Sequence, residues 1–367
     1  MTTPTHILGE LTAPQRALLE QYRFDGPTFE SLRAKLSKGE FSREANRIDA
    51  TLTPPASDEL ISWPKPNSEA EHVGQRALDE GLVAAAILNG GMATRFGGVV
   101  KGVVEVLPNR SFLELKLSTI GRAAPSAPVF IMNSFATARD TRTHLESSPH
   151  AEIAPELLHY ITQGISLRLS PEGQLFRTGE GEPSFYAPGH GDIFDALRTS
   201  PDFQAFVARG GRYIHVSNVD NLAATLSPRV IGAHILAGRS VSVEVAPKIS
   251  GDKGGAPVEV DGHLEIVEGF RFPDDFDHDT LPVFNTNTLV INSEVFSEPP
   301  PLRWYRADKK VEEAPVVQFE RLMGEITAFV DSTYLCVERD GPDGRFLPVK
   351  TPADLTELRD EIERRFG

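Results

Sequence analysis

Cysteine, long apolar runs and positive charge are all scarce in this 367-residue sequence, and each shortage excludes a class of protein. The single cysteine, Cys336, excludes a fold stapled by intramolecular disulfides. No apolar run approaches the roughly 20 residues that a membrane-spanning helix needs. The sequence also opens without the charged and apolar pattern of a secretory leader, so we expect a cytoplasmic protein in a reducing compartment.

Acidic side chains outnumber basic ones by 52 to 37, which gives a formal net charge of −15. Nucleic acids and anionic membranes normally bind to a basic stripe, so neither is an expected partner. A protein of this charge that binds phosphate must gather its cations in one place. The histidines lack the close spacing of metal ligands, which argues against a zinc site.

The pattern of apolar residues divides the chain into three parts. Residues 1–80 show helical spacings and a proline-rich connector, and are expected to form a helical N-terminal extension. Residues 81–350 alternate short apolar runs with amphipathic segments, which predicts an α/β core with a mixed, mostly parallel sheet. Residues 351–367 are expected to form a short C-terminal helix, capped by Thr351.

Local residue pairs mark several element ends. Three pairs have the spacing of a capping box and predict helix starts: Ser68 with Glu71, Ser111 with Glu114, and Thr137 with Asp140. Asp261-Gly262 lies between two alternating runs, and therefore predicts a hairpin turn.

A glycine-rich segment, Leu-Asn-Gly-Gly-Met-Ala-Thr-Arg-Phe-Gly-Gly over residues 88–98, follows the first expected buried strand. Glycines let backbone N–H groups close on phosphate oxygens, and Arg95 and Lys101 add positive charge. The segment has neither the Gly-Lys-Ser/Thr of a Walker A loop nor the dinucleotide G-x-G-x-x-G spacing. A phosphate-binding loop and a plain strand-to-helix turn both remain open.

Two later polar segments also adjoin expected strands or helices. Pro188-Gly-His-Gly-Asp192 predicts either a close ligand contact or a helix start capped by Asp192. Ser217-Asn-Val-Asp-Asn221 follows a strand and places Asp220 at the sheet edge where open α/β folds bind ligands. A carboxylate there is suited to Mg²⁺ whose shell is completed by phosphates and water, although Asp and Asn also favour plain turns.

Together these segments resemble the motifs of the UTP–glucose-1-phosphate uridylyltransferase family of UDP-sugar pyrophosphorylases. The matching runs follow the family's order over about residues 82–350: Leu88-Asn-Gly-Gly91, Lys101-Gly-Val-Val-Glu-Val106, Ser111-Phe-Leu-Glu-Leu115, Met132-Asn-Ser-Phe135, Gln163, Pro188-Gly-His-Gly-Asp192, Ser217-Asn-Val-Asp-Asn-Leu222, Lys253-Gly-Gly255, Phe284-Asn-Thr-Asn287 and Phe346-Leu-Pro-Val-Lys350. Any one motif is weakly specific, whereas the ordered set is highly specific.

The resemblance implies a Rossmann-like nucleotidyltransferase core that joins UTP to a hexose 1-phosphate, with glucose first, and releases pyrophosphate in the presence of Mg²⁺. By position, it implies catalytic, phosphate-facing roles for Arg95, Lys101, Lys248 and Lys350. It implies nucleotide contacts for Gly90, Gly91, Met132, Gln163, Gly189 and Asn218. Sugar contacts would come from His190, Gly255, Glu268, Asn285 and Asn287, and Asp220 would bind the metal.

The implied reaction suits these residue types. Two polyanions must be brought together against Coulomb repulsion, which cations and a metal ion reduce. No nucleophilic side chain is needed, because the sugar 1-phosphate is already ionised at neutral pH. Positioning and stabilisation of the departing pyrophosphate are the expected sources of catalysis.

Other readings of the same residues stay open. Thr94-Arg95 resembles the N-acetylglucosamine 1-phosphate enzymes, so UDP-N-acetylglucosamine is an alternative product. Asn218-Val-Asp220 superficially resembles the metal motif of UDP-sugar-dependent glycosyltransferases, and a non-catalytic nucleotide-binding module is a further alternative. The resemblance stops near residue 350, without the β-helical domain through which longer relatives assemble, so a monomer or weak homo-oligomer is expected.

Overall fold

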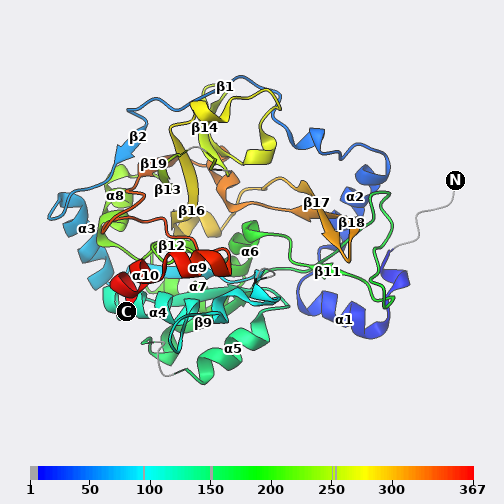
Figure 1. Ribbon diagram of the computed structural model, residues 1–367, viewed down its shortest axis with the longest axis horizontal. Coiled ribbons are helices and arrows are strands. Elements are labelled where there is room, and N and C mark those ends of the chain that lie inside the picture. The colour runs from blue at the N-terminus through cyan, green and yellow to red at the C-terminus, as the bar shows by residue number, and fades with distance from the viewer. Residues whose placement is uncertain (1–6, 94–95, 149–151, 250, 253) are drawn as a thin grey trace.

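The computed structural model describes residues 7–93, 96–148, 152–249, 251–252 and 254–367. An eight-stranded sheet forms its centre, in the order β2-β19-β13-β16-β12-β3-β8-β9 (Figure 1). Its strands are β2 (Leu60–Ser62), β3 (Val83–Leu88), β8 (Val129–Asn133), β9 (Leu158–Thr162), β12 (Tyr213–Asn218), β13 (Val241–Pro247), β16 (Val283–Asn292) and β19 (Ser332–Cys336).

Neighbouring strands of this sheet run parallel, except that β16 is antiparallel to both β12 and β13. The predicted mixed, mostly parallel sheet is therefore confirmed. Every residue of β3 is buried. Its odd-numbered residues belong to one hydrophobic cluster and its even-numbered residues to another, because successive side chains of a strand point to opposite faces.

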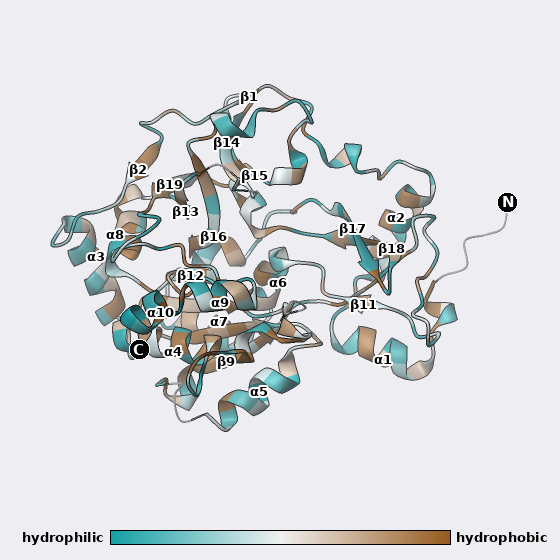
Figure 2. Ribbon diagram, viewed as in Figure 1, coloured by the Kyte–Doolittle hydropathy of each residue, from teal (hydrophilic) through white to brown (hydrophobic). Residues whose placement is uncertain are grey.

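Helices cover both faces of the sheet. One cluster packs against α3 (Glu69–Asp79), α4 (Phe112–Ala123), α5 (Ala138–Glu146), α8 (Pro228–Ala237), α9 (Pro352–Glu357) and α10 (Arg359–Phe366). The other packs against α6 (Ile193–Arg198) and α7 (Pro201–Ala208). Figure 2 shows hydrophobic colour in central strands such as β13 and β16, and hydrophilic colour over much of the outer helix α5.

The N-terminal helices α1 (Ala13–Gln21) and α2 (Gly26–Ser37) lie at one end of the molecule, beside β17 and β18 (Figure 1). They share a smaller hydrophobic cluster with residues of the strands β10, β11 and β18. These and the remaining strands are β1 (Leu52–Thr53), β4 (Met92–Ala93), β5 (Val99–Val100), β6 (Glu105–Leu107), β7 (Arg110–Ser111), β10 (Ser166–Leu167), β11 (Phe185–Tyr186), β14 (Ala256–Val260), β15 (His263–Val267), β17 (Tyr305–Val311) and β18 (Ala314–Glu320).

Most of the predicted element ends are present. Ser111 forms a capping box with Glu114 at α4. Thr351 caps α9 in the same way, although a second helix, α10, follows where one continuous helix was expected. The turn at Asp261-Gly262 joins β14 to β15.

Two capping predictions differ from the structure. The Ser68 hydroxyl accepts from the Glu71 N–H, but the Glu71 carboxylate accepts from the backbone of Asn67, so the box is only half formed. The predicted helix start at Thr137 is confirmed, since α5 begins at Ala138, but the capping box is absent because the Thr137 hydroxyl accepts from the Ser134 N–H instead. In the described part of the chain, no helix is both long and apolar enough to cross a membrane.

Candidate functional site

A cavity of about 350 Å³ lies at the carboxyl ends of β3, β8, β9 and β12. Nine of the residues singled out from the sequence line it together: Gly90, Gly91, Lys101, Met132, Gln163, Gly189, His190, Asn218 and Asp220. They converge because neighbouring parallel strands end at the same edge of a sheet, where open α/β folds place their ligands. We call this space the nucleotide cavity.

The glycine-rich segment forms one wall of the nucleotide cavity. A side chain at Gly90 would place its Cβ only 1.7 Å from the Gln163 amide nitrogen, so glycine is what lets Gln163 lie against this wall. Beneath it, the buried Asn89 amide donates to Asn133 and Thr141, both at 2.9 Å. These bonds fix the start of the loop to β8 and α5. Arg95, predicted to face the phosphates, lies outside the described residues.

Lys101 is a buried cation in this wall, with a side chain that is held on several sides. Its residue is only 8% exposed. Its Nζ donates to the Val349 carbonyl and lies 4.4 Å and 4.9 Å from the ring centres of Phe96 and Phe112. Ring faces stabilise a cation without neutralising it. Lys101 therefore places a cation in the lining of the cavity.

Asp220 also lines the cavity and is tied to the same segment, because its carbonyl accepts from the Val349 N–H at 3.0 Å. Burial raises the pKa of the Asp220 carboxyl above its usual range, and the nearby cations Lys101 and Lys350 oppose that rise. Among the described residues, no group of three or more His, Cys, Asp or Glu side chains could form a metal cage. A single carboxylate open to a cavity nevertheless fits Mg²⁺, which commonly binds one or two carboxylates together with substrate phosphates and water.

His190 also lines the nucleotide cavity, and a backbone N–H fixes the orientation of its imidazole. Its Nδ1 accepts from the Met323 N–H at 2.9 Å, which places the proton of the neutral ring on Nε2. Burial lowers the pKa of His190 to about 4, so the ring is neutral at physiological pH. It can therefore offer one N–H to a ligand without adding charge.

Of the residues predicted to bind the sugar, His190 lines the nucleotide cavity, and the other four form a second cluster that adjoins it. Asn287 donates through its amide to Asn218 at 3.0 Å, and its backbone N–H donates to the Asn285 side chain at 2.8 Å. Asn287 has a φ of 59°, a left-handed conformation that asparagine adopts more readily than most residues. The Asn285 N–H in turn donates to the Gly255 carbonyl at 2.8 Å.

Glu268 completes this cluster. Its carboxylate lies 3.1 Å from the point where a Cβ on Gly255 would stand, so glycine leaves room for the carboxylate there. Burial raises the pKa of Glu268 to about 6. The cluster thus presents amide and carboxyl groups that can donate to and accept from hydroxyls.

Two predicted lysines stand outside the lining of the nucleotide cavity. Lys248 follows β13, and its Nζ donates to the carbonyl of His278. Lys350 is exposed, but it is close enough to Asp220 to lower the pKa of that carboxyl. Their proposed contacts with phosphate are therefore less direct than that of Lys101.

The sequence analysis missed a buried lysine below the site. Lys116 is 1% exposed, and its Nζ donates to the Ser217 hydroxyl at 3.0 Å and to the Ala224 carbonyl at 2.7 Å. It therefore bridges the two ends of the turn that carries Asn218 and Asp220. A lysine within a run of otherwise apolar positions of α4 is the one signal that could have revealed it.

A buried ion pair anchors the other side of the same turn. Arg345 makes two hydrogen bonds to the Glu244 carboxylate, at 2.6 and 2.8 Å, and a third to the Thr225 carbonyl at 2.8 Å. Arg345 holds the pKa of Glu244 at about 2, against the opposing effect of burial. Arg345 thereby fixes the segment that runs on to Val349, which contacts both Lys101 and Asp220.

Lys116 makes the stability of the protein depend on pH in a predictable direction. Burial lowers its pKa to about 7, from an ordinary value of 10.5. Above neutral pH the unfolded chain binds more protons at this residue, so stability rises with pH. Between about pH 7 and pH 9, the unfolding free energy of the wild type should gain about 2 kcal/mol relative to Lys116→Met. Urea titrations of both proteins measure this difference, and parallel pH profiles would contradict it.

Asp192 was predicted either to accompany a ligand contact or to cap a helix start, and α6 does begin directly after it. Its side chain does not cap α6. One carboxylate oxygen accepts from the Gly164 N–H at 2.8 Å, and the other pairs with the Arg321 guanidinium. The residue therefore joins separate segments behind the nucleotide cavity.

Comparison with known proteins agrees with this arrangement. A family model described as UTP–glucose-1-phosphate uridylyltransferase matches residues 28–362. The UTP–glucose-1-phosphate uridylyltransferase of Solanum tuberosum is 30% identical over 348 residues, which cover 88% of this chain and 70% of that protein. The protein of that name from Saccharomyces cerevisiae is 29% identical over 333 residues, covering 84% of this chain and 65% of its own length.

Solved structures show the same fold. A mutant UDP-glucose pyrophosphorylase of Leishmania major in complex with UDP-glucose is 26% identical, with a TM-score of 0.71 over 95% of this chain and 79% of its own. The uridine diphosphate N-acetylglucosamine pyrophosphorylase of Trypanosoma brucei is 21% identical, with a TM-score of 0.76 over the same shares.

Proposed function

Since this chain belongs to the UTP–glucose-1-phosphate uridylyltransferase family and is a UDP-sugar pyrophosphorylase, we propose that its sugar substrate is glucose 1-phosphate. The observation that carries the proposal is that the cluster predicted to bind the sugar is in contact with the nucleotide cavity. The Asn287 amide, on the predicted sugar side, bonds to Asn218 in the nucleotide cavity. A sugar held by this cluster would therefore lie beside a nucleotide held in the cavity.

In this proposal UTP occupies the nucleotide cavity. Gly90, Gly91 and Gln163 face its uracil and ribose with Met132 and Gly189, and Lys101 faces its phosphates. Lys248 and Lys350, with Arg95 outside the described residues, are the further phosphate-facing cations. Asp220 would hold Mg²⁺ together with phosphate oxygens, and the ion, when bound, would reduce the repulsion between the two substrates.

The chemical step needs no proton-abstracting side chain. A phosphate oxygen of the sugar 1-phosphate attacks the α-phosphorus of UTP, and the bond from that phosphorus to the bridging oxygen of pyrophosphate breaks. The attacking oxygen is already ionised, so alignment and charge stabilisation carry the reaction. The fixed position of Lys101, between two rings and the Val349 carbonyl, supplies a cation that needs little rearrangement.

Glucose is favoured over other sugars for two reasons. The Gly-His-Gly-Asp and Phe-Asn-Thr-Asn motifs resemble the glucose branch, and the sequence relatives cited above are glucose enzymes by name. N-acetylglucosamine 1-phosphate is the second candidate, because Thr94-Arg95 resembles the acetamido branch. The comparisons support a pyrophosphorylase and not the glycosyltransferase alternative.

Pyrophosphate release with UTP, Mg²⁺ and a panel of sugar 1-phosphates tests the proposal. We expect kcat/KM for glucose 1-phosphate to exceed that for the galactose and N-acetylglucosamine compounds by at least about 100-fold, because a mismatched hydroxyl leaves a buried partner unpaired. Glu268→Gln, which keeps the side-chain shape, should reduce the ratio of kcat/KM for glucose 1-phosphate to kcat/KM for the other two sugars. Equal rates for the three sugars, or a preference for the acetamido sugar, would contradict glucose specificity.

A further inference from the structure

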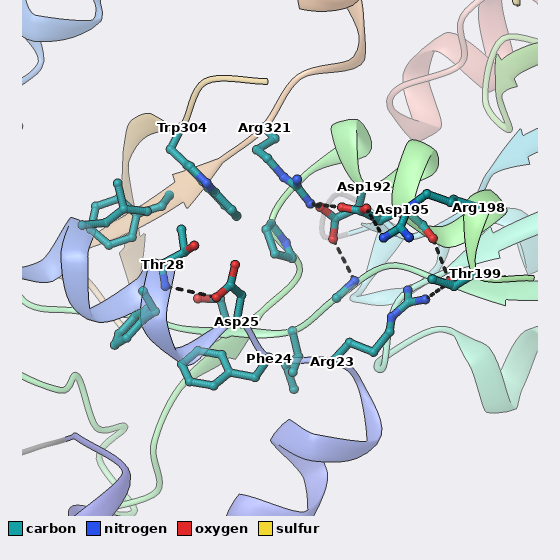
Figure 3. Close-up of a pocket in the computed structure, with 17 residues that line it drawn as sticks. Arg23, Phe24, Asp25, Thr28, Asp192, Asp195, Arg198, Thr199, Trp304 and Arg321 are labelled. Carbon is teal, nitrogen blue, oxygen red and sulfur yellow. Dashed lines mark hydrogen bonds and ion pairs between the residues drawn. The ribbon is translucent and has the colours of Figure 1, made fainter. Parts of the chain in front are cut away.

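A second cavity, of about 320 Å³, lies behind the loops that line the nucleotide cavity (Figure 3). The start of α2 closes one side of it, and Trp304 and Arg321 form another (Figure 3). Gly164, Pro188 and Asp192 reach it from the loops themselves. Each of these three lies within two residues of a residue that lines the nucleotide cavity. The two cavities therefore share their dividing wall.

Asp192 is the polar centre of that wall. It is 3% exposed, and both carboxylate oxygens are used. One accepts from the N–H of Gly164, the residue that follows Gln163. The other pairs with the Arg321 guanidinium, as Figure 3 shows. Because Asp192 also stands two residues after His190, one side chain connects both predicted nucleotide-binding segments.

The backbone of Arg321 holds the second segment directly. Its N–H donates to the Pro188 carbonyl at 2.8 Å, and its carbonyl accepts from the Gly191 N–H at 3.0 Å. A Cβ on Gly189 would stand 2.6 Å from the Arg321 carbonyl oxygen, so only glycine allows this approach. Gly189 also has a φ of 100°, which side chains rarely tolerate.

The Arg321 guanidinium is itself held in place. Besides Asp192, it pairs with Asp195 at 3.0 Å, and it lies 4.8 Å from the ring centre of Trp304. A guanidinium fixed by two carboxylates and a ring has little freedom to follow a moving loop. It therefore acts as a rigid support for Asp192.

We propose that Asp192 and Arg321 form a positioning pair that holds Gln163 and Gly189 in the arrangement that binds the uridine nucleotide. The inference rests on the proposed binding of UTP in the nucleotide cavity. Arg321 does not line that cavity, and neither does Asp192, so both act through the residues they hold. Loss of the pair would free the two segments from each other and weaken nucleotide binding more than the chemical step.

Asp192→Asn is the sharpest test, because asparagine keeps an oxygen for the Gly164 N–H and turns amide hydrogens toward Arg321. A charged hydrogen bond of this kind is worth about 10- to 100-fold in affinity, so we expect the dissociation constant and KM for UTP to rise by that factor. We expect kcat and the KM for the sugar phosphate to stay near their wild-type values. Calorimetry with UTP alone measures the affinity independently of turnover.

Three further variants separate positioning from general destabilisation. Arg321→Met should match Asp192→Asn, and the double variant should be no worse than either single one, because both remove the same contact. Arg321→Lys should recover part of the affinity by restoring the charge. Asp308→Asn is the matched control: its carboxylate pairs with Arg43 and Arg306, it lines neither of the two cavities, and its loss should change UTP affinity little.

Several results would overturn the proposal. Wild-type UTP affinity in Asp192→Asn would do so, as would additive losses in the double variant or an equal loss in Asp308→Asn. If Arg321→Met does not fold, Arg321→Lys and Asp192→Asn decide the matter. Failure of the proposed function is distinguishable, because it appears as wild-type protein that binds UTP without releasing pyrophosphate, or that binds no uridine nucleotide.

Discussion

Lys101→Ala is expected to reduce kcat by about 10²- to 10³-fold while leaving the fold intact, since the loss of one preorganised charge-stabilising donor typically has an effect of that size. Lys101 lines the nucleotide cavity directly, and its Nζ is held by the Val349 carbonyl and two aromatic rings. Removing it leaves the developing charge on pyrophosphate without this partner. Initial rates of pyrophosphate release at saturating UTP measure the effect.

Lys310→Ala is the matched control for this experiment. Its side chain is 71% exposed and pairs with Glu313 at the tip of the β17–β18 hairpin, outside the nucleotide cavity. It should retain the wild-type rate. Far-UV circular dichroism and thermal unfolding of Lys101→Ala establish that the fold persists. A rate close to that of the wild type in Lys101→Ala would refute its assignment; Arg95→Ala tests the neighbouring assignment in the same way.

Asp220→Asn is expected to lower the rate at a fixed Mg²⁺ concentration by at least about 100-fold, because loss of even an indirect partner of a metal ligand costs 10- to 100-fold. The substitution keeps the shape of the side chain and removes its charge. The Asp220 backbone contact with Val349 does not depend on the side chain, so the turn should survive. Rates measured against Mg²⁺ concentration should show a much higher requirement for the ion.

Asp331→Asn provides the control for this second experiment. Asp331 is 62% exposed, pairs with Arg239, and precedes β19 at the opposite edge of the sheet. Its variant should keep the wild-type response to Mg²⁺. An unchanged Mg²⁺ requirement in Asp220→Asn would remove Asp220 as the metal ligand.

The nucleotide cavity was predictable because its residues follow apolar runs. Gly90, Met132 and Asn218 each stand at or just after the end of a parallel strand, and such strands must deliver their ends to one edge. Strand order was not needed to reach that conclusion. The hairpin turn at residues 261–262 was predictable from local sequence, because aspartate followed by glycine readily adopts the backbone conformation of a tight turn.

The buried residues that hold the site in place were not predictable, because their bonding partners are distant in the sequence. Lys116 lies 101 residues from Ser217, and Arg345 lies 101 residues from Glu244. A single sequence does not reveal which strand faces which helix at those separations. The missing capping bond at Thr137 has a local cause: the Ser134 N–H donates to the hydroxyl that would have capped the helix.

The bond between Lys101 and the Val349 carbonyl joins residues 248 positions apart, and this separation determines when the bond can form during protein synthesis. At bacterial and eukaryotic elongation rates, the ribosome needs about 12–50 s to make the intervening stretch. During that time the nascent polypeptide can form its early strands, but Lys101, and Asp220 once it has been made, lack the Val349 segment that bonds to both. The newly made enzyme therefore becomes competent only after Val349 has been synthesised, and closure of this long loop adds to its folding time.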